Sequence, residues 1–290
     1  MAPDVLCIGS VLWDVIGRAP RAMEKGSDVP GRITRIPGGV ALNIAMTLRR
    51  FGLTPALLSA VGRDAEGDEL VAQCRLLGLV TEHLYRSDDL PTDRYMAVEG
   101  AGELIAAIAD AHSLEAAGAK ILRPLAGALK GWAGPVALDG NLTEGLLAEI
   151  AASALFAGAD LRVAPASPGK AERLVPLLGH PGVTLYVNRE EAGLIAKTSP
   201  EGAEAGARDL LARGAARVLV TDGGAPAALG TAEGVATRAP RAVMVRRVTG
   251  AGDTFMAAHV AAEMRGEAPE AALETALRAA AEYVSGEGGE

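Results

Sequence analysis

The chain has 290 residues, of which 49% are hydrophobic, 22% charged and only 3% aromatic, and its formal net charge is −8. The length suits one large α/β domain, or a large domain with a small one, built around an aliphatic, alanine-rich core. The acidic balance, the absence of a Lys/Arg-rich block and the few aromatic rings exclude nucleic acid as an expected partner.

The apolar segments and the two cysteines indicate where in the cell the protein is expected. No run of about 18 apolar residues predicts a membrane span, and no positively charged segment leads into an apolar run at the start of the sequence. Cys7 and Cys74 cannot form a CxxC site, and both lie among apolar residues. We therefore expect two buried free thiols, a reducing cytoplasm as the location, and no membrane partner.

The first third of the sequence mixes helical, extended and broken segments. Residues 5–11 and 56–61 read as buried strands, whereas residues 40–51 and 68–77 have helical spacing and end before glycine. Residues 20–37 are interrupted by glycine and proline. Residues 95–98 and 103–108 read as a β-hairpin, which with the segment before Pro37 predicts a small separate sheet.

After residue 110 the sequence alternates between strands and helices. Strands are expected at residues 136–138, 161–163, 184–187 and 217–221, with helices at residues 144–154, 168–178, 190–195 and 202–213. Residues 235–248 read as a strand pair whose second strand is 243–248, and residues 253–265 and 270–284 as two long helices. This alternation is typical of a parallel sheet covered on both faces.

The motif with the clearest chemistry is Thr249-Gly250-Ala251-Gly252-Asp253, at the start of the first of these long helices. Its glycines allow a tight turn, and the free amides of a helix start form an anion site suited to a phosphate. Asp253 in the first turn can accept the proton of an attacking hydroxyl. The alternative is structural: a turn followed by a capping aspartate. The spacing supports neither a P-loop nor a dinucleotide-binding motif.

Two segments carry a family resemblance. V-T-G-A-G-D-T-F at residues 248–255 resembles the C-terminal signature of the ribokinase-like (PfkB) carbohydrate kinases, and P-G-G-V-A-L-N-I-A at residues 37–45 resembles their N-terminal signature. The resemblance implies a three-layer αβα domain with a mainly parallel sheet (residues 1–13, 38–90 and 111–290) and a small β lid (residues 14–37 and 91–110). It also implies transfer of the γ-phosphate of ATP to a primary hydroxyl of a sugar or nucleoside.

The resemblance assigns a role to each matching residue. Asp253 would be the catalytic base, and the amides of Gly250, Ala251 and Gly252 the anion hole. The sugar would be held by Asp14, Gly38, Gly39 and Asn43. ATP would be bordered by Thr221, Gly223 and Thr249, and Asn188 and Glu191 form an N-x-x-E motif that positions Mg²⁺ and phosphates through water. Gly62 and Asp64 match a family turn. Asp14, Asn43, Asp64 and Glu191 also have plain structural readings as capping or solvated residues.

The expected phosphate acceptor is inferred from two lid segments that resemble those of pseudouridine kinases. They are T-D-R-Y at residues 92–95 and G-E-L-I-A-A-I-A-D at residues 102–110. By this resemblance Thr92, Tyr95, Asp110 and Asp139 join the substrate site. Pseudouridine is thus the expected acceptor, with ribose, another sugar or an ordinary nucleoside as alternatives, and a non-catalytic ligand-binding relative as a third reading.

Four positions depart from the pattern: Leu42, Ala111, Pro226 and Arg247. Arg247 stands where ribokinases carry an aspartate that helps to bind a monovalent cation, and its charge argues against potassium activation. Pro226 replaces a glycine near the expected adenine site. The exposed edges of the small lid sheet suit pairing of two subunits into a homodimer.

Overall fold

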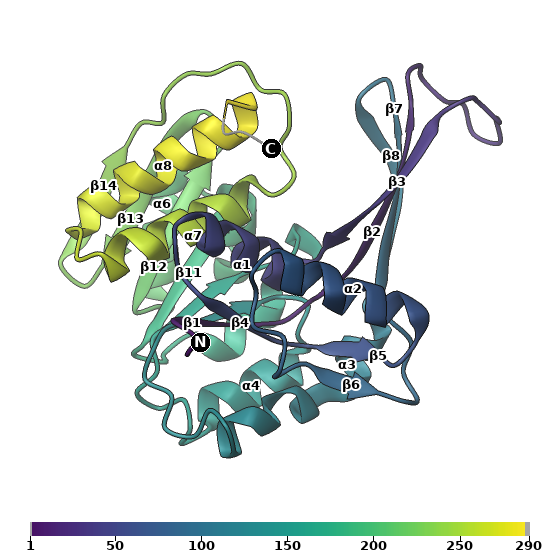
Figure 1. Cartoon of the computed structure of the whole chain (residues 1–290). Coiled ribbons are helices and arrows are strands. Elements are labelled where there is room, and N and C mark those ends of the chain that lie inside the picture. Colours follow the sequence, from purple (N-terminus) through teal and green to yellow (C-terminus); the bar gives the residue numbers. More distant parts are fainter. Residues whose placement is uncertain (1, 288–290) are drawn as a thin grey trace.

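The computed structural model describes residues 2–287 and is built on an eight-stranded sheet (Figure 1). From one edge to the other its strands are β14 (Gly234–Arg238), β13 (Ala225–Thr231), β12 (Arg217–Asp222), β11 (Val183–Asn188), β10 (Leu161–Ala164), β9 (Val136–Asp139), β1 (Val5–Ile8) and β4 (Pro55–Leu58). The six strands from β12 to β4 are parallel, and β13 and β14 add an antiparallel hairpin at one edge. All carboxyl ends of the parallel strands therefore meet at one edge.

Helices cover both faces of this sheet. One face packs against α1 (Val40–Arg50), α2 (Ala65–Leu76), α7 (Ala251–Met264) and α8 (Pro269–Ser285). The other face packs against α3 (His112–Ala117), α4 (Glu144–Ala152), α5 (Arg189–Ala196), α6 (Ala203–Ala212) and the 3₁₀ segments η1 (Gly118–Ala126) and η2 (Pro168–Leu177). The expected α/β class with a three-layer arrangement is confirmed.

The central strands explain why the core lies on both sides of the sheet. β1, β4, β9 and β10 have four residues each, and every one of these residues is buried. Alternate side chains of β1 enter opposite core clusters, because successive residues of a strand face opposite sides. Cys7 and Cys74 are buried and free, as the sequence predicted.

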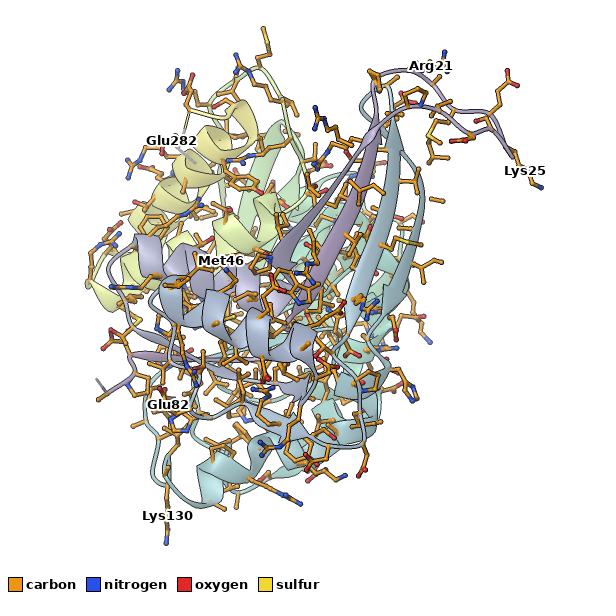
Figure 2. The ribbon with its side chains drawn as sticks, turned by 45° about the vertical axis from the view of Figure 1, so that its right-hand side comes forward. Arg21, Lys25, Met46, Glu82, Lys130 and Glu282 are labelled. Carbon is orange, nitrogen blue, oxygen red and sulfur yellow. The ribbon has the colours of Figure 1, made fainter. Side chains whose placement is uncertain are left out.

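A separate four-stranded sheet projects from the body (Figure 1). Its order is β3 (Arg32–Gly38), β2 (Leu12–Ala19), β7 (Arg94–Gly100) and β8 (Glu103–Asp110), with β2 and β7 parallel. The connection between β2 and β3, which carries Arg21 and Lys25, reaches far from the helices (Figure 2). Every residue of β8 is exposed. A smaller parallel pair, β5 (Ala60–Gly62) and β6 (Tyr85–Ser87), lies near its base.

The junction between the body and this sheet is held by specific contacts. The Trp13 backbone amide donates to the carbonyl of Asp93, and its indole Nε1 donates to the carbonyl of Glu66 at 3.0 Å. The Asp93 carboxylate accepts from the amides of Ser113 and Leu114 at the start of α3. The two strands that enter the lid are therefore fixed to α2 and α3 where they leave the body.

The expected strand pair within residues 235–248 is wrong. Only β14 forms there, and its partner is β13, which lies earlier in the chain. Residues 239–249 belong to no strand or helix, although Met244, Val245 and Val248 gave the segment an apolar, strand-like pattern. These three side chains are 60% or more exposed, because no neighbouring strand covers them. In the described part of the chain, no helix combines the length and apolar character needed to cross a bilayer.

Candidate active site

Two segments far apart in the sequence meet at the edge where the parallel strands end. Asn43 on α1 donates its side-chain amide to the Asp253 carboxylate on α7 at 3.0 Å, across 210 residues of sequence. The two helices pack beside each other on one face of the sheet (Figure 1). The N-terminal and C-terminal motifs thus form one site.

In the turn before α7 the Ala251 amide donates to the Val248 carbonyl at 3.0 Å, so within the described structure only the amides of Gly250 and Gly252 are left for a ligand among the three expected donors. Gly250 occupies the cap position with φ +88°, and a Cβ there would lie 2.6 Å from the Tyr283 hydroxyl, so only glycine fits. No side chain caps α7 within the described structure. Gly252 has an ordinary φ, is exposed, and would carry a Cβ into open space. No protein atom requires a glycine at 252, and the missing side chain leaves the backbone there open to close approach by a ligand.

The surroundings of Asp253 change the pKa of its carboxyl group. Burial raises its pKa from the ordinary 3.8 to about 7. The Asn43 amide opposes this rise, whereas the negative charges of Asp139, Asp14 and Glu191 add to it. A carboxylate that titrates near neutral pH is a stronger base than an ordinary aspartate and is about half ionised at pH 7. The arrangement can therefore take a proton from a hydroxyl beside an anion-binding turn.

Asp14 and the two glycines at 38 and 39 pack together. A Cβ on Gly38 would lie 2.1 Å from the Asp14 carboxylate, and one on Gly39, at φ +100°, would lie 2.5 Å from the Ser10 carbonyl. Burial raises the pKa of Asp14 to about 6. Both glycines therefore have a protein-packing reason to be glycine, and they bring Asp14 against the start of α1.

Asp139 does not contact solvent, which corrects the expectation that it binds substrate directly. It is fully buried, and one carboxylate oxygen accepts from the Ser10 amide and hydroxyl and from the Ala41 amide at 2.7–3.0 Å. The other oxygen accepts from the Asn141 amide at 2.7 Å. Burial is the main cause that raises its pKa. Asp139 therefore fixes the start of α1, on which Asn43 is carried.

Ser10 and Asn141 are site-supporting residues that were not singled out from the sequence. The Ser10 hydroxyl accepts from the Val40 amide at 2.8 Å and from the Asn141 side chain at 2.9 Å. The Lys170 ammonium donates to the Asn141 side chain at 2.5 Å. Both residues follow buried strands, so a search for polar residues at the carboxyl ends of strands would have found them.

The lid residues separate into two faces. In the ladder, Tyr95 lies opposite Asp14 and Ala109, and Asp110 lies opposite Arg94. Directly opposed residues project from one face and successive residues from opposite faces. Tyr95 therefore shares the face of Asp14, and the charge of Asp14 helps to raise the pKa of the Tyr95 hydroxyl after burial. Asp110 projects from the other face, so the structure does not bring it to Tyr95.

Thr92 lies at the base of the lid and is only 3% exposed. Its amide and hydroxyl both donate to Asp64, at 2.8 and 2.6 Å, and Asp64 also caps α2 through the Gly67 amide. These bonds, above all that from the Thr92 side chain, hold the pKa of Asp64 below its usual value against the effect of burial. The Thr92 hydroxyl thus tethers the lid to α2, which corrects the expectation that it faces the substrate.

Asn188 and Glu191 form a capping box at the start of α5. The Asn188 side chain accepts from the Glu191 amide at 2.9 Å, and the Glu191 carboxylate accepts from the Asn188 amide at 2.8 Å. Thr221 lies opposite Asn188 in the neighbouring strand, and Gly223 follows with φ +57°. Burial raises the pKa of Glu191. These residues line the same strand edge as Asp253.

The residues present fit a magnesium ion held through water. The charges of Asp139, Asp14 and Glu191 add to the raised pKa of Asp253, but the Asp139 oxygens accept from amides and the Ser10 hydroxyl, so Asp14 and Glu191 are the carboxylates left to face a hard divalent cation through water. Among residues 2–287, no group of three or more His, Cys, Asp or Glu side chains is arranged to hold a metal directly. His259 is buried, with its Nδ1 at 2.9 Å from the Tyr186 hydroxyl, as expected for a structural histidine.

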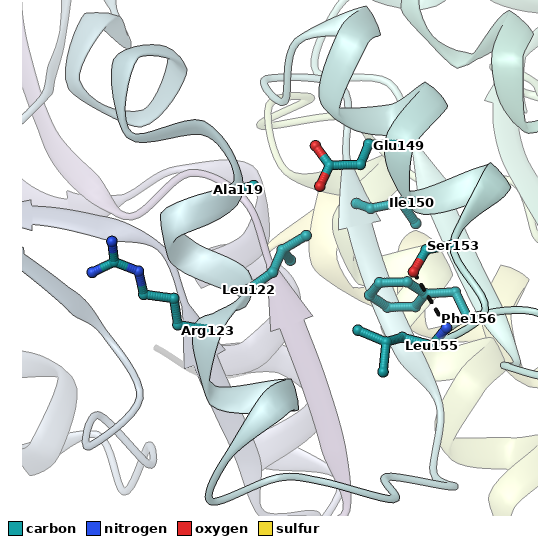
Figure 3. Close-up of a pocket in the computed structure, with 8 residues that line it drawn as sticks. All are labelled: Ala119, Leu122, Arg123, Glu149, Ile150, Ser153, Leu155 and Phe156. Carbon is teal, nitrogen blue, oxygen red and sulfur yellow. Dashed lines mark hydrogen bonds between the residues drawn. The ribbon is translucent and has the colours of Figure 1, made fainter.

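A pocket of about 170 Å³ lies elsewhere, between η1 and α4 (Figure 3). Leu122, Ile150 and Phe156 line it, with Arg123 and Glu149 also contributing. None of the residues predicted for the site lines this pocket, so we assign it no part in the chemistry.

Comparison with known proteins adds independent information. Residues 2–290 match the model of the pfkB family carbohydrate kinases. The protein named pseudouridine kinase of Escherichia coli strain K12 is 31% identical over 258 residues, which are 87% of this chain and 81% of that protein.

Solved structures agree on the fold. A carbohydrate kinase from Agrobacterium tumefaciens superposes with a TM-score of 0.83 at 24% identity, covering 100% of this chain and 94% of that one. A ribokinase from Arabidopsis thaliana, complexed with ribose and ATP, superposes with a TM-score of 0.77 at 20% identity, covering 98% and 93%. The ribokinase-like arrangement expected from the sequence is thus confirmed.

Proposed function

Since the chain belongs to the PfkB family of carbohydrate kinases, and is therefore a phosphotransferase acting on a hydroxyl group, we propose that it phosphorylates the 5′-hydroxyl of pseudouridine with ATP. The observation that carries the chemistry is the Asn43–Asp253 contact beside an uncapped helix start. The choice of acceptor rests on the likeness to the E. coli pseudouridine kinase and on Tyr95 beside Asp14.

The proposed mechanism uses the two sides of the site separately. Asp14 and Asn43 hold the sugar hydroxyls, and Tyr95 lies against the base. Asp253, ionised, accepts the proton of the 5′-hydroxyl as that oxygen bonds to the γ-phosphorus and the bond to ADP breaks. The amides of Gly250 and Gly252 stabilise the charge that develops on the transferring group, while the Ala251 amide, expected as a third donor, is bonded to the Val248 carbonyl.

The nucleotide would lie along the strand edge formed by Thr221, Gly223 and Thr249, with Asn188 and Glu191 beneath its phosphates. Mg²⁺, when bound, neutralises phosphate charge, and Glu191 would hold it through water. We further propose that no monovalent cation is required, because Arg247 already places a fixed positive charge near the turn. Equal turnover in potassium and choline chloride would be the expected result.

A substrate panel tests the acceptor. The purified protein, Mg-ATP and equal concentrations of pseudouridine, uridine, ribose or fructose are mixed, and ADP release is followed. We expect the highest kcat/KM for pseudouridine. No preference over uridine and ribose would refute this acceptor and favour another sugar or nucleoside kinase of the same family.

The Asp253→Asn variant separates a kinase from a non-catalytic binding relative. Loss of a general base lowers turnover by roughly 10²-fold or more, while acceptor binding, read by calorimetry, should persist. Unchanged turnover would refute the role assigned to Asp253. Absence of turnover in the unsubstituted chain with every acceptor would favour the binding relative.

Three coarser expectations complete the proposal. Residues 14–37 and 91–110 form a lid domain on a body made of the rest, and two buried free thiols suit a cytoplasmic location. The lid also exposes Ile33, Ile108 and Leu104 by 60–78%, which favours a homodimer paired through the lid. A monomeric mass in light scattering would contradict the dimer.

A further inference from the structure

The segment that leads into the turn has no secondary structure of its own. Residues 239–249 belong to no strand or helix, yet the amides of Gly250 and Gly252, which we propose bind the phosphate, follow directly. An amide site stabilises a transition state only if its donors are held in place before the reaction. Something outside the segment must therefore hold it.

The last turn of α8 supplies this support. The amides of Arg246 and Arg247 both donate to the Val284 carbonyl, at 2.8 and 3.2 Å. The Arg247 side-chain Nε donates to the Tyr283 carbonyl at 2.8 Å, and its guanidinium lies over the Tyr283 ring, 3.9 Å from the centroid. A cation at the C-terminal end of a helix is favourable, because the free carbonyls there carry partial negative charge.

Tyr283 connects this support to the turn itself. Its hydroxyl donates to the Thr249 carbonyl at 2.8 Å and fills the space where Gly250 would carry a Cβ. The Thr249 carbonyl and the Gly250 amide belong to one planar peptide group and point in opposite directions. Binding the carbonyl to Tyr283 therefore aims the Gly250 amide away from α8 and fixes the first donor of the anion site.

We propose that Arg247 and Tyr283 act as a clasp that positions the turn of residues 249–252 for phosphoryl transfer. The two are positioning residues, since neither would touch the reacting atoms. The inference rests on the proposed kinase function for its effect on turnover, but not for its effect on the backbone. Positioning of the turn would explain why an arginine occupies position 247, whether or not a cation binds nearby.

The test uses Tyr283→Phe, which removes one hydroxyl and keeps the ring under Arg247, and Arg247→Met, which removes the guanidinium. Tyr85→Phe and Arg238→Met are matched controls. Tyr85 lies on β6 beside Lys120 and Arg123, and Arg238 bonds to Glu270 and Glu274 on α8, in each case away from the turn. Two quantities are measured on the full chain: steady-state kinetics and amide hydrogen exchange of peptides covering residues 246–254.

For both clasp variants we expect kcat to fall roughly 10-fold, the size of one lost hydrogen bond in a positioned site, with the KM of the acceptor unchanged. Exchange of the amides of Arg246, Arg247 and Ala251, which donate to the Val284 and Val248 carbonyls, should become at least about 3-fold faster. The melting temperature should stay within about 2 °C because the contacts are at the surface. The double variant should lose little more than either single one, since the two side chains act together.

The outcomes separate the two proposals. Faster exchange in the variants of a chain that phosphorylates no acceptor supports the clasp and refutes the kinase function. Wild-type exchange in both variants overturns the clasp, whether or not kcat falls, because a fall would then arise elsewhere. Equal effects in Tyr85→Phe or Arg238→Met would also overturn it.

Discussion

The hydrogen bond from Asn43 to Asp253 makes a quantitative prediction about pH. The pKa of Asp253 is raised to about 7, chiefly by burial, and Asn43 opposes the rise. Only the ionised carboxylate accepts a proton, so kcat/KM should fall about tenfold per pH unit below pH 7 and reach a plateau above pH 8. Between about pH 6 and pH 8 the profile then reports Asp253, and below pH 6 protonation of Asp14, whose pKa burial raises to about 6, adds to the fall.

Replacing Asn43 with leucine keeps the size of the side chain and removes the donor. A hydrogen bond to a charged group contributes about 1.5 kcal/mol, which corresponds to about one pH unit. The midpoint should move from near pH 7 to near pH 8. At pH 7 the ionised fraction of Asp253 then drops from about a half to about a tenth, roughly a fivefold loss. This part of the loss disappears above pH 9, whereas the loss of the Asn43 contact with the sugar lowers the plateau at every pH.

Asp14→Asn is the opposing control. Its negative charge contributes to the raised pKa of Asp253, so its removal should move the midpoint to lower pH, whatever it does to the plateau. The assay is ADP release with pseudouridine as acceptor between pH 5.5 and 9.5. An unmoved midpoint in both variants, or an acidic limb that persists in Asp253→Asn, would refute the assignment of this limb to Asp253.

Four further variants test other parts of the site. Asp253→Asn should be more stable than the wild type, because folding raises the pKa of Asp253 from 3.8 to about 7 and keeping it ionised in the folded chain costs about 4 kcal/mol above pH 7. The gain in melting temperature should grow from pH 4 to pH 7. A pH-independent gain would contradict this origin. Gly252→Ala should keep the wild-type melting temperature yet lose at least about 10-fold in kcat. Gly38→Ala, whose methyl group would meet Asp14, should raise the KM of the acceptor. Wild-type kinetics of either variant would exclude close contact of a ligand with that glycine. Asp139→Ala should lower the free energy of unfolding by about 3 kcal/mol, since it leaves the donors of Ser10, Ala41 and Asn141 unpaired, and a change in KM alone would instead indicate a substrate contact.

Much of the architecture follows from local sequence pattern. The apolar runs of β1, β9 and β10 and the helical spacing of α1 and α8 are properties of short segments, and the structure has them where the pattern predicts them. The loop at residues 239–249 shows the limit of this reasoning. Its apolar residues predict a strand, but a strand forms only where another pairs with it, and β13 pairs with β14 instead.

For the site residues too, some features follow from local sequence and others depend on neighbours in the folded structure. The positions of Asp253 and Gly250 follow from a local motif, whereas the task of each polar side chain depends on its neighbours in space. Asp139 and Thr92 are polar residues near the site in sequence terms, but their side chains bond to other protein groups. Asp139 accepts from three amides and the Ser10 hydroxyl, and the Thr92 hydroxyl donates to the Asp64 carboxylate. Asp110 differs from Tyr95 only by the face of the sheet, which is set by a pairing register that one strand alone does not reveal.

The contact between Asn43 and Asp253 also has a consequence for synthesis of the chain. The two residues are 210 positions apart, so a ribosome working at about 5–20 residues per second delivers the second roughly 10–40 s after the first. Throughout that interval the nascent chain lacks Asp253, the residue that we propose as the base. A growing polypeptide of this kind is therefore unable to consume ATP until α7 has emerged and docked against α1.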